Sequence, residues 1–269
     1  MLRLATIIAV ASLAGCDATK PTVDNAQVLS KGGDGNPITA VAPQQVELKA
    51  ADGVTVYGTY YPTATRPKAI ILLFHQAGSS KGEYAGIAPQ LVRKGYAALA
   101  IDQRSGGGMY GPNRTVTGMT SAQKDNSADY LSVLPDMEAA FDWAKTKNAP
   151  IILWGSSYSA SLVFLLAASA QDQAHALIAF SPGEYFNDKK MVERAAAKVE
   201  VPVFVDEAST PDEIAEAKAI VTATASTDRQ QYLPKTGIHG SSTLNASKNP
   251  GGADENWRAV LSFLKRVAP

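Results

Sequence analysis

Residues 151–160, IILWGSSYSA, have the pattern of a short strand that turns sharply into a helix. At such a turn a central serine sits on strained backbone with its hydroxyl clear of the strand, and the first amides of the helix point toward a bound group. Close packing there requires small residues two positions before and two positions after the serine. Gly155 and Ser159 meet this requirement, although glycine is the usual residue at the second position. Ser157 is therefore a candidate nucleophile.

A serine hydroxyl is a weak nucleophile at neutral pH and needs a neighbouring base. The chain has three histidines that could supply one, His75, His175 and His239. The last of these lies in a glycine-flanked loop that precedes the final helical pattern. The alternative interpretation of the pattern around Ser157 is an ordinary serine-rich helix start, since serine is favoured at helix N-termini.

Continuous apolar runs predict strands that are buried on both faces of a mostly parallel sheet, at 69–74, 96–101, 151–154, 176–180 and 201–205. Helical patterns separate or follow these runs, at 84–94, 135–147, 158–170, 212–225 and 255–267. This alternation predicts an α/β fold with helices on both faces of the sheet. Ahead of the first run, residues 45–50 and 54–61 alternate apolar and polar side chains around Asp52-Gly53, which indicates a hairpin.

Two loops that follow these strands carry further motifs. Residues 75–78, HQAG, resemble the H-G-x-G oxyanion loop of α/β-hydrolases, with Gln76 where glycine is usual. Residues 102–106 resemble the D-x-R-G-x-G motif of the same proteins, with Ser105 replacing a glycine. In this order and spacing, the chain from about Val46 to its end is similar to the α/β-hydrolases, close in style to the dienelactone hydrolase and esterase branch.

The resemblance implies the chain order nucleophile, acid, base, which selects His239 as the base. His75 is then expected to pack or hydrogen-bond beneath the oxyanion loop, and His175 to begin a strand. The stretch between Ser181 and Val201 is too short for a large cap domain in the usual place. An open pocket is therefore expected.

The acid of the triad should follow the strand predicted at 201–205. Family spacing places it in the turn before the next helix and favours Asp212, ahead of Glu213, Asp206 and Glu207. The alternative for Asp212 is that it stabilises the helix start, where acidic residues complement the helix dipole.

The resemblance also implies an oxyanion hole made of backbone amides. The amide of Tyr158, directly after the nucleophile, would be one donor, and that of Ala77 or Gln76 the other. Because backbone groups do this work, glutamine at position 76 is compatible with the assignment.

The long loop from Gln103 to Tyr130 carries Met109, Tyr110 and Met119. Two interpretations stay open for it, one wall of the pocket or a disordered, glycine-rich surface loop.

The 25 basic and 25 acidic residues leave zero formal charge, and no dense Lys/Arg run is present, which argues against a nucleic-acid partner. No His/Cys/Asp cluster has metal-ligand spacing and no Gly-rich loop resembles a phosphate site, so neither a metal nor another cofactor is expected.

The N-terminus has a basic start and then an apolar segment too short to span a bilayer, as in a secretion signal. The segment ends in Leu13-Ala14-Gly15-Cys16, which resembles the bacterial lipoprotein box. The resemblance implies removal of residues 1–15 and lipidation of Cys16, the one cysteine of the chain. The alternative is a plain secretory signal with a chance cysteine.

Residues 16–43 are rich in Gly, Asn, Asp, Thr and Pro and are expected to form a flexible tether. The hydrolase domain is expected to cover residues 44–269. A lipidated Cys16 would anchor it to a membrane of the bacterial cell envelope, facing the periplasm. Asp17 resembles the residue that retains some lipoproteins in the inner membrane.

These features together predict a membrane-tethered serine hydrolase of the α/β-hydrolase fold that cleaves an ester or another acyl substrate through Ser157, His239 and Asp212. A lactone or dienelactone hydrolase, or a cell-envelope peptidase, would use the same residues. A different class of function is also open, an inactive lipoprotein that keeps the fold as a binding or scaffolding module.

Overall fold

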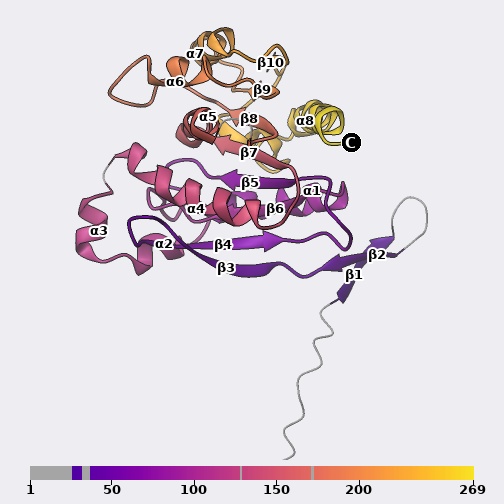
Figure 1. The fold of residues 1–269 in the computed structure, drawn as a ribbon. Coiled ribbons are helices and arrows are strands. Elements are labelled where there is room, and N and C mark those ends of the chain that lie inside the picture. The colour runs from indigo at the N-terminus through magenta and orange to yellow at the C-terminus, as the bar shows by residue number, and fades with distance from the viewer. Residues whose placement is uncertain (1–25, 32–36, 128, 171–172) are drawn as a thin grey trace, which may run out of the picture.

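The computed structural model describes residues 26–31, 37–127, 129–170 and 173–269. Its main sheet has eight strands in the order β10-β9-β8-β7-β5-β6-β4-β3 (Figure 1). These strands are β3 (Gln44–Lys49), β4 (Thr55–Tyr61), β5 (Ile70–Phe74), β6 (Ala97–Ile101), β7 (Ile151–Ser156), β8 (Ala176–Phe180), β9 (Val203–Asp206) and β10 (Arg229–Tyr232). The six neighbouring strands β10, β9, β8, β7, β5 and β6 pair in parallel. The strand β4 pairs antiparallel with both β6 and β3.

The connections between these strands are mostly helical. The α-helices are α1 (Ala88–Arg93), α2 (Arg114–Gly118), α3 (Ser121–Asp125), α4 (Leu134–Lys145), α5 (Tyr158–Ala170), α6 (Met191–Ala196), α7 (Pro211–Ala223) and α8 (Ala253–Val267). Short 3-10 turns are η1 (Lys81–Tyr84), η2 (Tyr130–Val133) and η4 (Gly240–Leu244). The arrangement is the α/β-hydrolase fold, as predicted from the sequence.

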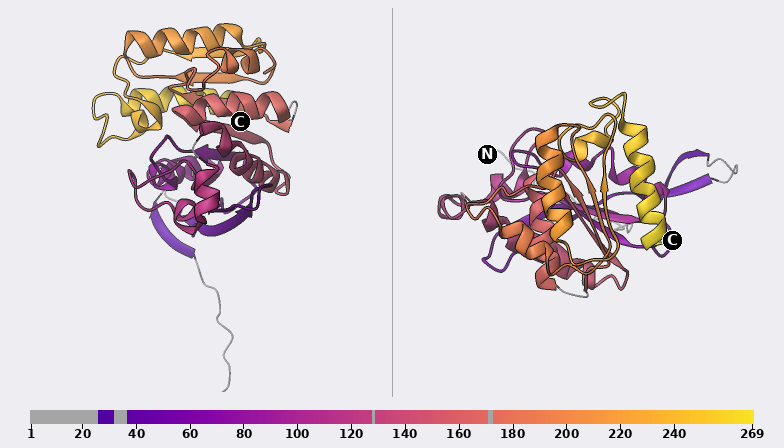
Figure 2. Two further views of the ribbon diagram at one scale, coloured as in Figure 1. Left: turned by 90° about the vertical axis from the view of Figure 1, so that its left-hand side faces the viewer. Right: turned by 90° about the horizontal axis from the view of Figure 1, so that it is seen from above.

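The central strands are apolar throughout because helices cover both faces of the sheet. Ile70 and Leu72 of β5 lie in one core cluster with residues of α4, α5, α6 and α7. Ile71 and Leu73, which point to the opposite face, lie in a second cluster with residues of α1 and α8. Figure 2 shows α7 and α8 on opposite sides of the sheet. Every residue of β5 is buried, as expected for a strand between two helical layers.

The predicted hairpin around Asp52-Gly53 is confirmed by the antiparallel pair β3 and β4. Gly53 has a φ of +84°, a conformation that glycine adopts without a steric penalty. The long loop after β6 contains the two helices α2 and α3, which the sequence analysis did not predict. In the fully described stretch 181–202 the chain forms one short helix, α6, so no large cap is inserted there.

Two strands lie in the segment expected to be a tether. They are β1 (Ala26–Lys31) and β2 (Pro37–Val41), which pair antiparallel in a small sheet of their own. The predicted signal segment, Cys16 and Asp17 lie outside the described residues. Within the described part of the chain, no helix is both long and apolar enough to cross a membrane.

Candidate active site

The predicted turn at Ser157 is present and strained. Ser157 has a φ of +59°, a left-handed conformation that serine seldom adopts, directly between β7 and α5. Its amide donates to the carbonyl of Phe180 at 2.8 Å, which fixes the turn to β8. A Cβ atom at Gly155 would lie 2.3 Å from the carbonyl oxygen of Ser159. The requirement for a small residue at position 155 is therefore steric.

Ser159, which stands where glycine is usual, is fully buried and hydrogen-bonded. Its hydroxyl donates to the carbonyl of His75 at 2.7 Å and accepts from Nε2 of Gln103 at 2.9 Å. The hydroxyl thus connects the first turn of α5 to the loops that follow β5 and β6. The departure from the family pattern adds a polar connection and leaves the turn intact.

His239 lies between Ser157 and a carboxylate. Its Nε2 is 2.8 Å from Oγ of Ser157, and its Nδ1 is 3.1 Å from Oε1 of Glu213. The carboxylate accepts a hydrogen bond from Nδ1–H, which leaves Nε2 as the acceptor of the serine proton. The three side chains thus have the connections of a nucleophile, a base and an orienting acid.

The carboxylate at His239 is that of Glu213, and the prediction of Asp212 is corrected on this point. Asp212 and Glu213 are both in the first turn of α7, and successive residues of a helix point about 100° apart. Asp212 is exposed, whereas Glu213 is partly buried and faces His239. The role left for Asp212 is the alternative one, an acidic residue that complements the helix dipole at the N-terminus of α7.

The environment of Glu213 favours its ionised form. Burial raises the pKa of Glu213, but hydrogen bonds with His239 and Ser181 outweigh this effect, so the pKa is lowered overall. Ser181, at the end of β8, also accepts a hydrogen bond from the amide of Gly240 at 3.0 Å. Ser181 therefore contacts both the acid and the loop of His239. Sequence reasoning missed it, because a lone serine after a strand carries no motif.

The other two candidate acids, Asp206 and Glu207, are buried away from His239. Burial raises the pKa of Asp206, and neither of its carboxylate oxygens has a hydrogen-bond partner among the described residues. Burial also raises the pKa of Glu207 to about 8, although Gln231 donates to this carboxylate at 2.8 Å. The raised pKa values favour the protonated form of both groups, which is unsuited to orienting an imidazolium.

The backbone amides predicted as oxyanion donors differ in their hydrogen bonding. Tyr158 is the first residue of α5, where the amides have no partner within the helix. Neither its amide nor that of Ala77 donates to another group in the described part of the chain. The amide of Gln76, by contrast, donates to Oε2 of Glu83 at 3.0 Å. The amides of Ala77 and Tyr158 are thus free to bind an oxyanion, whereas that of Gln76 is already engaged.

His75 is a structural residue beneath the oxyanion loop, as expected. Its Nε2 accepts from the amide of Gln103 at 2.9 Å, so the proton is on Nδ1, which lies 2.7 Å from the carbonyl of Gln76. Burial lowers the pKa of His75 to about 4, which keeps the ring neutral. His175 lies directly before β8, and its Nε2 contacts the carbonyl of Val267, outside the triad.

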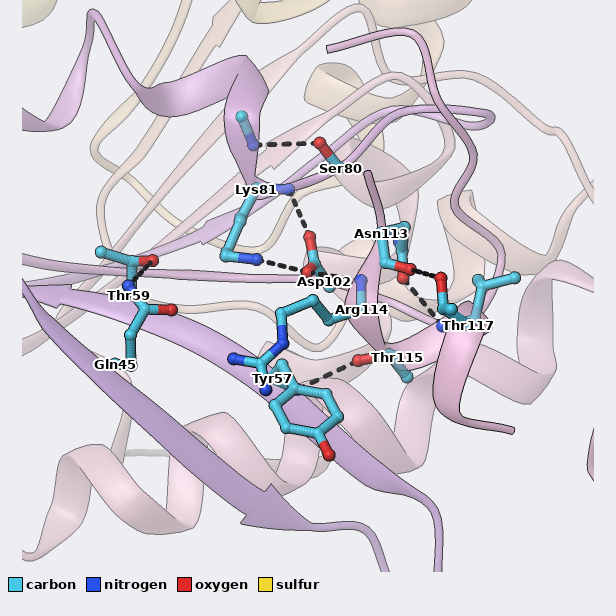
Figure 3. Close-up of polar contacts among 12 residues, drawn as sticks. Gln45, Tyr57, Thr59, Ser80, Lys81, Asp102, Asn113, Arg114, Thr115 and Thr117 are labelled. Carbon is cyan, nitrogen blue, oxygen red and sulfur yellow. Dashed lines mark hydrogen bonds and ion pairs between the residues drawn. The ribbon is translucent and has the colours of Figure 1, made fainter. Parts of the chain in front are cut away.

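A cluster around Asp102 holds the loop after β6. This buried carboxylate accepts from the amides of Lys81 and Arg114, each at 2.9 Å, and forms an ion pair with the Lys81 side chain (Figure 3). These bonds connect η1, which follows the oxyanion loop, to the start of α2. Asp102 of the motif at 102–106 thus holds two loops beside the site in place through hydrogen bonds and an ion pair.

Three tyrosines contact residues of the candidate site or its neighbours. Tyr130 stacks on Tyr158 with 4.5 Å between the ring centroids. Tyr185 donates to the carbonyl of Ser181 at 2.9 Å, and its hydroxyl lies near Ser157. Tyr110 bonds the hydroxyl of Ser242 in the loop that follows His239. Tyr110 and Tyr130 belong to the loop 103–130, which therefore packs against α5 beside Ser157 and against the turn that follows His239.

The described residues contain no group of three or more His, Cys, Asp or Glu side chains that could hold a metal ion. The chemistry that this arrangement can support is that of the serine, the histidine, the carboxylate and the two free amides.

Residues 65–206, just over half of the chain, match the sequence profile of the family described as serine aminopeptidase, S33. The chain belongs to this family. The matched region includes Ser157 and both candidate oxyanion donors. His239 and Glu213 lie beyond it.

Several solved structures are similar to this chain in fold. The dienelactone hydrolase of Anabaena variabilis is 16% identical with a TM-score of 0.65, and the match covers 84% of this chain and 99% of that one. The esterase Pf2001 of Pyrococcus furiosus is 18% identical with a TM-score of 0.63, over 85% and 93% of the two chains. A cold-adapted esterase from an Arctic intertidal metagenomic library is 20% identical with a TM-score of 0.63, over 90% and 100%.

One curated relative is the polyketide transferase ATR5 of Stachybotrys chlorohalonatus, 27% identical over 147 residues. The match covers 53% of this S33-family chain and 46% of that relative, so it spans less than half of the relative's length.

The assignment of the acid predicts different outcomes at two neighbouring positions. Glu213→Gln should lower kcat by about 10³-fold or more, because the amide no longer stabilises the imidazolium of His239. Asp212→Asn should stay within about twofold of the wild type, as expected for an exposed side chain without a partner at the site. Ester hydrolysis, with circular dichroism to confirm folding, measures both. Retained activity in Glu213→Gln with loss in Asp212→Asn would reverse the assignment.

The buried carboxyl of Glu207 predicts a pH-dependent stability. At pH values between 4.5, the ordinary pKa of a glutamate, and about 8, its pKa in the folded state, Glu207 is protonated when the chain is folded and ionised when it is unfolded. The free energy of unfolding therefore falls as pH rises through this range, because the folded state binds one more proton than the unfolded state. Glu207→Gln keeps an oxygen for Gln231 and should be more stable than the wild type at pH 8, by about 1 kcal/mol or more, and equal to it at pH 4.

Urea unfolding at both pH values measures this difference. The exposed Glu200→Gln is the matched control and should show no such change with pH. A Glu207→Gln curve that runs parallel to the wild type from pH 4 to pH 8 would show that Glu207 ionises normally.

Proposed function

We propose that this chain is a serine hydrolase that cleaves a carboxylic ester through an acyl-enzyme on Ser157. The observation that carries the proposal is the continuous hydrogen-bonded series from Ser157 Oγ through His239 to Glu213, beside two amides without protein acceptors. Any one of these features occurs in proteins without catalytic activity. Their combination is what acyl transfer requires.

In the first half of the reaction, Oγ of Ser157 attacks the ester carbonyl carbon while Nε2 of His239 takes the hydroxyl proton. The bond from this carbon to the alcohol oxygen then breaks, and the proton on Nε2 passes to the leaving alcohol. In the second half, a water molecule gives a proton to Nε2 and attacks the acyl carbon. The bond from the acyl carbon to Oγ then breaks, the proton on Nε2 returns to Oγ, and the carboxylic acid is released.

The charge that develops during these steps is met by groups already in place. The amides of Ala77 and Tyr158 would stabilise the oxyanion, and each such donor is typically worth about 3 kcal/mol in the transition state. Glu213 would hold the His239 ring in the productive tautomer and stabilise its charged form. Its lowered pKa keeps it ionised for this role.

The choice of an ester is supported by the similar structures, which include two esterases and a dienelactone hydrolase. The family description, serine aminopeptidase, makes a peptide bond the second candidate. The same triad would serve either substrate or a lactone, because the attacking and leaving groups occupy the same positions. The surroundings of Ser157, among them Tyr130 and Tyr185, would then decide which substrates fit.

For the N-terminal segment we propose lipidation at Cys16 and attachment to the periplasmic side of a bacterial membrane, on the resemblance to the lipoprotein box. In the expected result, the full chain fractionates with membranes and the Cys16→Ser variant does not. Equal fractionation of the two forms would contradict lipidation.

The proposed activity predicts Ser157-dependent turnover of p-nitrophenyl esters, measured as a series from acetate to decanoate on residues 44–269. Ser157→Ala should lower the rate by at least about 10³-fold in a folded protein. The chain-length profile would report the depth of the acyl site. Turnover that persists in Ser157→Ala would exclude this serine as the nucleophile, and a parallel assay with aminoacyl p-nitroanilides tests the peptidase alternative.

A further inference from the structure

Glu83, in the 3-10 turn η1, is a buried carboxylate that accepts hydrogen bonds on both oxygens. Its residue is 6% exposed. Oε2 accepts from the amide of Gln76 at 3.0 Å and from the hydroxyl of Ser79 at 3.1 Å. Oε1 accepts from the hydroxyl of Ser156 at 2.7 Å. Three donors from two separate strand ends thus converge on one side chain.

Two of these donors are next to groups of the candidate active site. Gln76 directly precedes Ala77, whose amide is a candidate oxyanion donor. Ser156 directly precedes Ser157. A displacement of Glu83 would therefore be transmitted through a single peptide unit to the oxyanion donor and to the nucleophile.

The loop of His239 joins the same network through Ser156. The hydroxyl of Ser156 accepts from the amide of Ser241 at 2.9 Å while it donates to Glu83. A Cβ atom at Gly240 would lie 2.5 Å from Oγ of Ser156, so the backbone of this loop packs directly on that hydroxyl. Trp154 of β7 adds a further bond, from its Nε1 to the hydroxyl of Ser241 at 2.9 Å.

A carboxylate suits this position better than any neutral side chain. A buried charge costs several kcal/mol unless hydrogen bonds replace its water. Here three donors offset part of that cost, and burial still raises the pKa of Glu83. An amide side chain has one oxygen and would turn an NH₂ group toward either Ser156 or Gln76. The mechanism proposed above makes no direct use of Glu83, so its burial calls for a separate explanation.

We propose that Glu83 is a positioning residue that fixes the relative positions of the oxyanion loop, the Ser157 turn and the His239 loop. The proposal rests on the proposed hydrolase function for its catalytic consequence. Its structural consequence, the connection among the three segments, stands independently. Misplacement of reacting groups by about 1 Å can cost about 10²-fold in rate, so a loss of this connection should lower kcat.

The test is Glu83→Gln, with the exposed Glu138→Gln as the matched control. In Glu83→Gln we expect kcat for a p-nitrophenyl ester to fall about 10- to 100-fold with KM within about threefold, because the substrate contacts remain while the reacting groups shift. Glu138→Gln should match the wild type. Wild-type kcat in Glu83→Gln would overturn the proposal.

A double-variant comparison shows whether Glu83 acts through Ser156. If it does, Glu83→Gln/Ser156→Ala should lose little more kcat than the worse single variant. Losses that multiply would mean that the two side chains act independently, which contradicts the proposal. Should Glu83→Gln fail to fold, Ser156→Ala carries the same expectation for kcat, since it removes a single hydroxyl.

Amide hydrogen exchange separates this inference from the proposed function, because it needs no substrate. In Glu83→Gln, exchange should rise in segments 75–80, 156–160 and 239–244 together and stay unchanged in α8. Unchanged exchange in the three segments overturns the role of Glu83 whatever the activity. Raised exchange in a protein whose wild type hydrolyses nothing supports the structural connection and refutes the proposed function.

Discussion

The structure of this site depends on one hydrogen bond between groups far apart in the chain. Oγ of Ser157 and Nε2 of His239 are separated by 82 positions in sequence and by 2.8 Å in space. The serine reaches this place on a backbone with a φ of +59°, a conformation that costs free energy and persists only where the surroundings enforce it. Those surroundings are the steric fit at Gly155, the bond from Ser157 to β8 and the packing of α5 on the sheet.

The histidine reaches the same place through a loop with a different kind of support. Polar side chains hold this loop to the strand ends: Ser181 accepts from the amide of Gly240, and Ser156 accepts from that of Ser241. Each of these hydroxyls lies next to a carboxylate, Glu213 in one case and Glu83 in the other. Two serine–carboxylate pairs therefore support the site. The Ser156–Glu83 pair is buried and accepts from backbone amides, whereas in the Ser181–Glu213 pair the carboxylate contacts His239 itself.

Much of this arrangement could be predicted from the sequence, and the successes have a common cause. Apolar runs identify buried strands, and the pattern around Ser157 identifies the turn because sterics allow few residues there. His239 followed from the chain order of a family that the chain does belong to. These features depend on local composition or on order along the chain, both of which a sequence displays directly.

The remaining features depend on side-chain direction in three dimensions. Asp212 and Glu213 are both acidic residues in the first turn of a helix, so the sequence does not distinguish their roles. The rotation between successive helical residues decides which one faces His239. Glu83, Ser156 and Ser181 carry no motif, because their partners come from other strand ends. The helices in the loop 103–130 also gave no clear periodic signal, since each is five residues long. Asp102 from another strand end holds the start of α2.

The most direct test of the account is covalent labelling of the folded protein with a fluorophosphonate, followed by peptide mass spectrometry to locate the adduct. The account predicts one adduct per chain, on Ser157, that forms at least about 10²-fold more slowly in His239→Ala, because the base no longer removes the serine proton. A folded wild type that takes no label, or that takes it on another residue, would contradict the account and favour a fold kept as a binding or scaffolding module.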